Sequence, residues 1–178
     1  LCGLTRWPNV EKPPLLWLCI DATACSFLEK QGQPRLQFGA GKVELDRVRV
    51  ALYVLLIGFH VLLADVGSVW LRNPMPYLEG PFDVVAAPEQ RLGEGFGFAL
   101  GTDFMFLRST NASANVMLRL AEHAVATEKL EDTLNDLLFT GVAANGSMVP
   151  GRYGAQYRRD EWSELRVKML DMEAFPSS

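Results

Sequence analysis

Residues 59–74 read FHVLLADVGSVWLRNP, and this stretch decides which fold is expected for the chain. An apolar run of strand length ends in one carboxylate, Asp65, and is followed by a Gly-Ser break and a short aromatic and basic segment. In open α/β folds a buried parallel strand delivers a polar group in this way to the carboxyl edge of the sheet, where ligands bind. Asp65 is therefore the first candidate for a functional side chain. The alternative is a structural carboxylate that caps a helix or holds a loop.

Strands and helices are predicted to alternate through the rest of the chain. Apolar or alternating runs predict strands at 15–20, 35–38, 59–64, 82–87, 103–108 and 165–170. Apolar residues at helical spacing predict helices at 22–31, 43–57, 112–126 and 130–140. Glycine-rich segments at 91–101 and 146–154 are predicted to be loops.

This alternation predicts one α/β domain over residues 1–178, with three layers and a mostly parallel central sheet. The sheet is expected to contain residues 15–20, 59–64 and 104–107, with helices on both faces. Ligands are expected at the carboxyl ends of the strands that carry Asp21, Asp65 and Asp83. Asp21 is also predicted to cap the helix that follows it.

Composition excludes some classes of function. The 178 residues carry a net charge of -4 without a cluster of Lys or Arg, which argues against nucleic acid as a partner. The longest apolar run, residues 48–64, is interrupted by Arg49, Gly58 and His60, so no membrane span is expected within this segment. The three cysteines, at positions 2, 19 and 25, lack metal-ligand spacing and are predicted to be buried free thiols.

The stretch at 59–74 also resembles the signature of the nucleotide-diphospho-sugar transferase family, which includes plant and algal cell-wall arabinosyl- and xylosyltransferases. In that family the strand continues as D-V-D-V-V-W-L-R-D-P, whose acidic pair is the D-x-D motif of the GT-A fold. The same frame reads DVGSVWLRNP here, so Gly67 stands where the second acid would be. Four further blocks are similar to the family in the same order, at 17–32, 102–110, 130–138 and 167–176. Within them, Asp103 replaces a Gly of the family pattern, and Glu131 stands where Gln is usual.

The resemblance implies a three-layer, GT-A-like (Rossmann-like) domain that is incomplete at both ends, since a first nucleotide-binding strand and a late His would lie outside this sequence. It implies transfer of a sugar from a nucleotide-diphosphate donor to a glycan or glycoprotein acceptor. The expected location is the Golgi lumen or another part of the secretory pathway. The alternative is a relative that has lost catalysis and acts as a lumenal or extracellular scaffold.

The family frame also implies a donor site. Asp65 would hold Mn²⁺ or Mg²⁺, a hard cation that neutralises a pyrophosphate leaving group, although Gly67 withholds the second acid. Asp65, Trp70, Arg72 and Asp103 would contact the nucleotide sugar, with Asp103 as the compensating acid. Trp70 would otherwise be a core aromatic, and Arg72 would otherwise pair with a nearby carboxylate.

A second candidate group lies at the start of the last predicted helix. Glu131, Asp132 and Asn135 would supply a base that activates the acceptor, or hydrogen bonds to sugar hydroxyls. A solvated helix turn is the alternative for these residues. His60 and His123 are expected to be structural, because neither has a nucleophile motif nearby.

Overall fold

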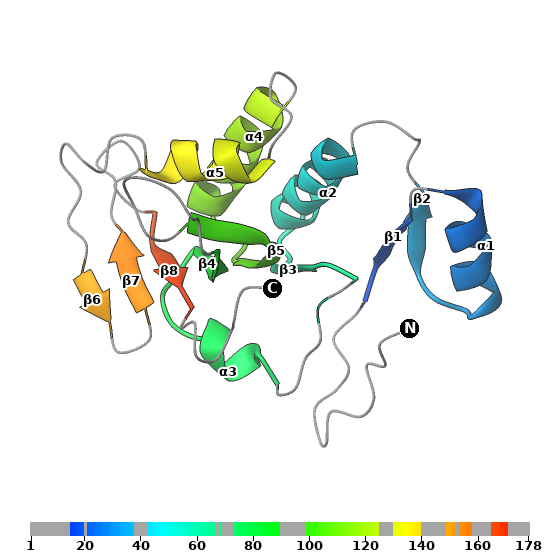
Figure 1. The fold of residues 1–178 in the computed structure, drawn as a ribbon, viewed down its shortest axis with the longest axis horizontal. Helices are drawn as coiled ribbons and strands as arrows, with labels where there is room; N and C mark the ends of the chain where they lie inside the picture. Colours follow the sequence, from blue (N-terminus) through cyan, green and yellow to red (C-terminus); the bar gives the residue numbers. More distant parts are fainter. Residues whose placement is uncertain are drawn as a thin grey trace.

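The computed structural model describes residues 15–19, 21–37, 43–66, 68, 73–89, 99–124, 130–139, 149–151, 154–157 and 165–170. Strands and helices are mixed along the chain (Figure 1). The strands are β1 (Trp17–Cys19), β2 (Arg35–Gln37), β3 (Val61–Ala64), β4 (Val84–Glu89), β5 (Ala99–Leu107), β6 (Val149–Gly151), β7 (Gly154–Tyr157) and β8 (Val167–Met169). The helices are α1 (Ala22–Lys30), α2 (Val43–Leu56), α3 (Met75–Leu78), α4 (Asn111–Ala124) and α5 (Leu130–Phe139). The predicted α/β class is confirmed.

The larger sheet has six strands in the order β3-β5-β4-β8-β7-β6. Only the pairing of β4 with β8 is parallel among these described strands, and the other four pairings are antiparallel. The prediction of a mostly parallel central sheet is therefore wrong. Residues 59–64 were expected in its centre, but β3 is an edge strand that pairs antiparallel with β5.

The expected strand at 15–20 also lies elsewhere, because β1 pairs with β2 in a separate two-stranded parallel sheet. An apolar run shows that a segment is buried, but it does not encode the direction or identity of its neighbours. Two loop predictions were also partly wrong. The glycine-rich segments contribute Ala99–Gly101 to β5 and contain β6.

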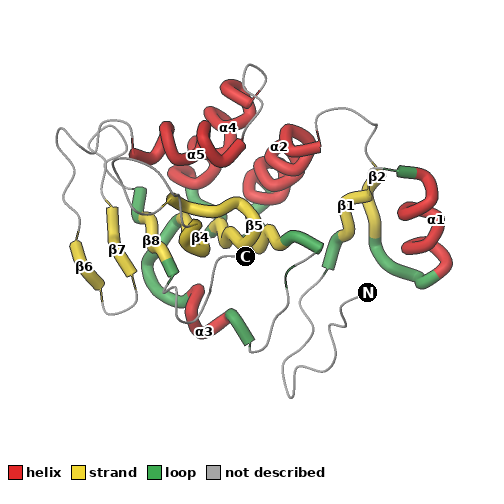
Figure 2. Tube along the Cα trace, viewed as in Figure 1, coloured by secondary structure: helices red, strands yellow, loops and turns green. Residues whose placement is uncertain are grey.

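Three helices cover one face of the larger sheet, and Figure 2 shows α2, α4 and α5 gathered on that side. Their apolar stripes pack with the sheet residues of the same face, and both groups are fully or almost fully buried: Val48, Leu55, Val116, Leu120, Leu134, Val84, Met105 and Leu107. On the opposite face α3 packs with Phe104 and Phe106. Residues 104–107 thus alternate between the two faces, as a strand requires. The three-layer arrangement remains a prediction, since α3 is the one helix described on the second face.

Helix α2 follows the apolar spacing read from the sequence. Its buried residues Leu45, Val48, Ala51 and Leu55 recur every three or four positions and face α4 and the sheet. The helix ends before Gly58, whose φ of 95° is a conformation that suits glycine. Strand β3 begins three residues later, so the short connection between them places the end of α2 close to β3.

A short helix and one buried lysine close the second face of the sheet. Lys168 of β8 donates a hydrogen bond to the carbonyl of Tyr77 in α3 at 2.7 Å, and its ammonium lies 5.3 Å from the centre of the Phe82 ring. Burial lowers the pKa of Lys168, because the charged form loses hydration there. This lysine therefore ties α3 to the sheet.

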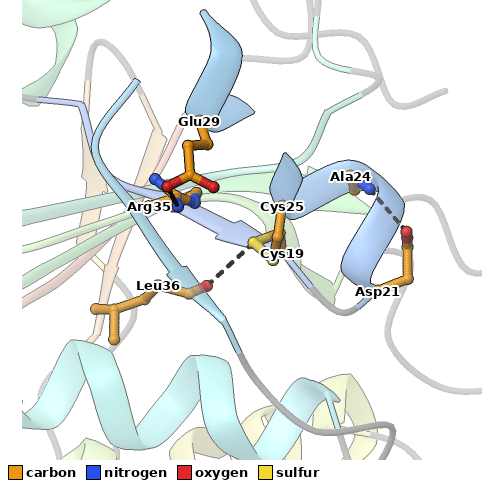
Figure 3. Close-up of a disulfide and its surroundings, with 7 residues drawn as sticks. All are labelled: Cys19, Asp21, Ala24, Cys25, Glu29, Arg35 and Leu36. Atoms are coloured by element: carbon orange, nitrogen blue, oxygen red, sulfur yellow. Dashed lines mark hydrogen bonds and ion pairs between the residues drawn. A yellow bond between two sulfur atoms is a disulfide. The ribbon is translucent and has the colours of Figure 1, made fainter. Parts of the chain in front are cut away.

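The segment β1-α1-β2 is held by its own contacts. Asp21 Oδ1 accepts a hydrogen bond from the Ala24 amide at 2.7 Å, which confirms its predicted role as the cap of α1. Cys19 and Cys25 form a disulfide that joins β1 to α1, and Figure 3 shows it beside the ion pair of Glu29 with Arg35. The prediction of free thiols is wrong for these two cysteines. The turn of chain after β1 brings their Cα atoms to 5.5 Å, which an odd cysteine count does not reveal.

Among the described residues, no helix has the length and apolar character needed to cross a membrane.

We predict that this disulfide stabilises the β1-α1-β2 segment, because its apolar cluster is small. The cluster contains Cys19, Cys25 and Leu28 as its buried members. Replacing Cys25→Ser should cost about 2 kcal/mol of local stability, the size expected for closing a short loop. Amide hydrogen exchange of residues 22–30 measures this loss, with Cys2→Ser as the matched control. Unchanged protection of α1 in Cys25→Ser, or labelling of Cys19 by a thiol reagent before reduction, would contradict the assignment.

Candidate functional site

The antiparallel pairing of β3 with β5 creates the candidate site. Val61 pairs with Leu107 and Ala64 with Phe104, so the end of β3 lies beside the middle of β5. The Asp65 amide donates a hydrogen bond to the Asp103 carbonyl at 3.0 Å. Two candidate acids that are 38 positions apart in the sequence are thereby neighbours at one end of the sheet. Both carboxylates are exposed.

Arg47 of α2 completes this group. Its Nη1 donates to Asp65 Oδ1 at 2.6 Å, and its Nη2 donates to the Thr102 carbonyl at 2.7 Å. The Arg47 side chain is 17% exposed and that of Asp65 is 45% exposed, so the ion pair is partly withdrawn from water. The guanidinium thus links α2 to the end of β3 and to the middle of β5. Arg47 was not among the candidate residues identified from the sequence, and nothing in its local pattern indicates its partners.

The environment of Asp103 disfavours its charged form. Partial burial raises the pKa of Asp103, and a side-chain hydrogen bond with Asp65 and the negative charges of Asp65 and Glu131 raise it further. Arg47 acts in the opposite direction, because a nearby positive charge favours the ionised carboxylate. Within the described ranges, the site is therefore an acidic group with Arg47 as its cation.

Two of the three predicted catalytic residues of α5, Glu131 and Asn135, bind residues of β5 next to this group. Glu131 Oε1 accepts hydrogen bonds from the Thr102 amide at 3.2 Å and from the Thr102 hydroxyl at 3.1 Å. Asn135 is buried, accepts from the Leu100 amide at 2.8 Å and donates to the Leu100 carbonyl at 2.9 Å. Asn135 therefore extends the hydrogen bonding of β5 into α5. Asp132 is half-buried in the first turn of α5.

The other two aspartates expected near the ligand lie elsewhere. Asp21 caps α1 in the smaller sheet's segment. Asp83 precedes β4 and is buried, with Oδ1 accepting from the Thr110 hydroxyl at 2.9 Å and Oδ2 from the Arg166 amide at 2.7 Å. It lies near the end of β5 opposite to Asp103, because Val84 pairs with Leu107. The expectation that Asp21, Asp65 and Asp83 meet at one edge is wrong, since the strands that carry them do not run in parallel in one sheet.

Three positions of the family frame, Gly67, Trp70 and Arg72, lie outside the described residues. Their predicted parts in donor binding stay predictions. The two histidines have partners of a structural kind or lie on the surface. His60 Nδ1 accepts from the Ser109 amide at 2.9 Å, and its ring meets Phe106 edge-on at 5.9 Å. His123 is exposed near the end of α4.

The described residues do not by themselves fit Mn²⁺ or Mg²⁺. No group of three or more His, Cys, Asp or Glu side chains within the described ranges has an arrangement that could hold a metal ion. Such ions need several oxygen ligands, and one oxygen of Asp65 already accepts from Arg47. The metal at Asp65 therefore remains a prediction.

Comparisons with known proteins agree with the family frame. The family model described as nucleotide-diphospho-sugar transferase matches residues 39–177. The chain is 30% identical to beta-arabinofuranosyltransferase RAY1 of Arabidopsis thaliana over 142 residues, which cover 76% of this chain and 25% of that protein. The chain thus spans about a quarter of the length of this relative. No solved structure matches the chain.

We predict that Asn135 has a structural role. Asn135→Ala should lower the free energy of unfolding by about 1–3 kcal/mol, because the Leu100 amide and carbonyl would remain buried without partners. Urea unfolding measures the change, and Asn111→Ala, whose side chain is exposed, is the matched control. An Asn135→Ala variant as stable as the control would show that the amide is free for another role.

A second prediction follows from the raised pKa of Asp103. Because the folded chain disfavours the charged carboxylate of Asp103, its ionisation lowers the free energy of unfolding. This loss of stability begins as the pH rises above the ordinary pKa of 3.8 and grows until the pH has passed the raised pKa of the folded chain. Asp103→Asn should therefore gain stability relative to the unsubstituted chain at neutral pH, and the gain should vanish towards pH 3.8. Urea unfolding at several pH values tests this, with Asp46→Asn as the control. A difference between the two chains that does not depend on pH would contradict it.

Proposed function

Because this chain belongs to the nucleotide-diphospho-sugar transferase family, we propose that it takes part in sugar transfer from a nucleotide-diphosphate donor to a glycan or glycoprotein acceptor. The observation that carries the proposal is the group at the end of β3. Asp65 retains the first acid of the family frame, and Asp103 and Arg47 lie beside it. We place the donor at this exposed end of the sheet.

The residues have separate parts in this proposal. Asp65 has one carboxylate oxygen held by Arg47, which fixes its orientation, and its side chain is still 45% exposed. Asp65 and Asp103 would accept hydrogen bonds from hydroxyl groups of the donor. Trp70 and Arg72 would contact the base or sugar and the phosphates, as the family frame implies. Glu131 and Asn135 hold β5 against α5 and keep Asp103 in place.

The choice of sugar follows from the relative. RAY1 carries the name beta-arabinofuranosyltransferase, so a nucleotide-activated arabinofuranose is the first donor that we propose. We place the chain in the secretory pathway or Golgi lumen. The Cys19–Cys25 disulfide supports this location, because disulfides persist in oxidising compartments.

A second candidate is a relative without catalysis that uses the fold as a lumenal or extracellular scaffold. Two observations favour it. Gly67 stands in place of the second acid, and Asp65 is engaged by Arg47. An assay of sugar transfer separates the two candidates.

We predict that the full chain releases nucleoside diphosphate from at least one nucleotide-diphospho-sugar in a panel that includes an arabinofuranosyl donor, and transfers the sugar to a glycan acceptor. Asp65→Asn should lower turnover roughly tenfold or more, since a hydrogen bond to a charged group contributes about 1.5–3 kcal/mol. Asp46→Asn, at a half-buried position of α2 where the carboxylate pairs with Arg49, is the control. Product release is measured by chromatography and sugar transfer by mass spectrometry. No turnover with any donor would favour the scaffold, and equal turnover in Asp65→Asn would remove Asp65 from the site.

A further inference from the structure

We propose that Arg47 is the built-in cation of this site, and that its guanidinium balances Asp65 in the place where a divalent cation would otherwise bind. The chain then holds no divalent cation at Asp65. This inference deepens the proposed function and rests on it only for the role of the site in sugar transfer. Its test does not depend on that role, because the test measures metal binding directly.

Two hydrogen bonds hold the guanidinium of Arg47 in one position. The distance of 2.6 Å to Asp65 Oδ1 is at the short end for a charge-assisted hydrogen bond. The second bond, to the Thr102 carbonyl at 2.7 Å, fixes the plane of the guanidinium against β5. Since the Arg47 side chain is 17% exposed, water screens this pair less than a surface pair. A guanidinium also keeps its charge at every physiological pH.

The charges around Arg47 explain why a cation is needed at this position. Asp103 interacts with the negative charges of Asp65 and of Glu131, and this repulsion opposes the ionisation of Asp103. Arg47 is the positive group that acts against this repulsion. Without Arg47, Asp103 would lie near the negative charges of Asp65 and Glu131 with no balancing positive charge from the described residues.

The remaining ligand capacity is too small for a hard divalent cation. Mg²⁺ requires six oxygen ligands in a regular octahedron, and Mn²⁺ also favours carboxylate and water oxygens. Asp65 has one oxygen left after pairing with Arg47, and Asp103 shares a side-chain hydrogen bond with Asp65. Both Thr102 donors hold Glu131 Oε1, and Gly67 adds no carboxylate. A cation would therefore have to share Asp65 with Arg47, whose positive charge repels it.

The proposal predicts a metal response that depends on Arg47. The full chain should show no saturable Mn²⁺ binding by isothermal titration calorimetry. Arg47→Met should melt at a lower temperature and recover by about 2–4 °C in millimolar Mn²⁺, because a cation then stabilises the unbalanced carboxylates. Arg47→Lys should behave like the unsubstituted chain, since it keeps the charge. Arg49→Met removes an exposed arginine of the same helix and is the matched control, with no response to Mn²⁺.

Two results of these metal-binding measurements would overturn the proposal. The first is saturable Mn²⁺ binding by the unsubstituted chain that Asp65→Asn abolishes, and this measurement stands even if Arg47→Met does not fold. The second is a folded Arg47→Met variant whose melting does not respond to Mn²⁺, which would leave Arg47 with a packing role alone. Sugar transfer is measured with and without EDTA. Loss of transfer in EDTA would overturn this inference and leave the proposed function intact, whereas absence of transfer in all conditions would count against the proposed function and leave the metal titration valid.

Discussion

The pairing of β5 with a strand on each side is the constraint on which the rest of the structure depends. Strand β5 has nine residues and is antiparallel to β3 along one edge and to β4 along the other. It therefore joins β3 to the rest of the larger sheet. Its side chains alternate between the helical face, through Met105 and Leu107, and the face of α3, through Phe104 and Phe106. Its first half carries Thr102 and Asp103 to the end of β3, so the same strand that organises the core also assembles the polar site.

The residues around Asp65 differ in their chemistry from the acidic pair of the family frame. The chain belongs to a family of sugar transferases, and the relative named above is an arabinofuranosyltransferase of which it spans a quarter. Around Asp65, however, the described residues supply one guanidinium rather than a group of metal ligands. The balance of charge at this position therefore comes from α2, a helix that contains none of the family's acidic positions.

Much of the fold could be predicted from local pattern. The helical spacing of Leu45, Val48 and Leu55 predicted α2 to within one residue at its end, and the Asp21 cap was predicted from its place before an apolar helix. The first acid of the frame, Asp65, was also located at a strand end, as expected from the run before it. These features depend on residues a few positions apart, so the sequence determines them through helical periodicity, strand alternation and capping.

Tertiary structure alone decided which of these elements meet. The direction and edge position of β3 depend on its pairing with β5, and the Cys19–Cys25 bond depends on how the chain returns after β1. Arg47 reaches Asp65 across 18 positions and the Thr102 carbonyl across 55, while Asn135 reaches Leu100 across 35. Such partners are set by the path of the whole chain, because a side chain's type states what it can bind but not what the fold brings within reach. The sequence by itself determined the elements, the family frame and the candidate acids, and the packing of α2 and α5 against β5 determined their partners.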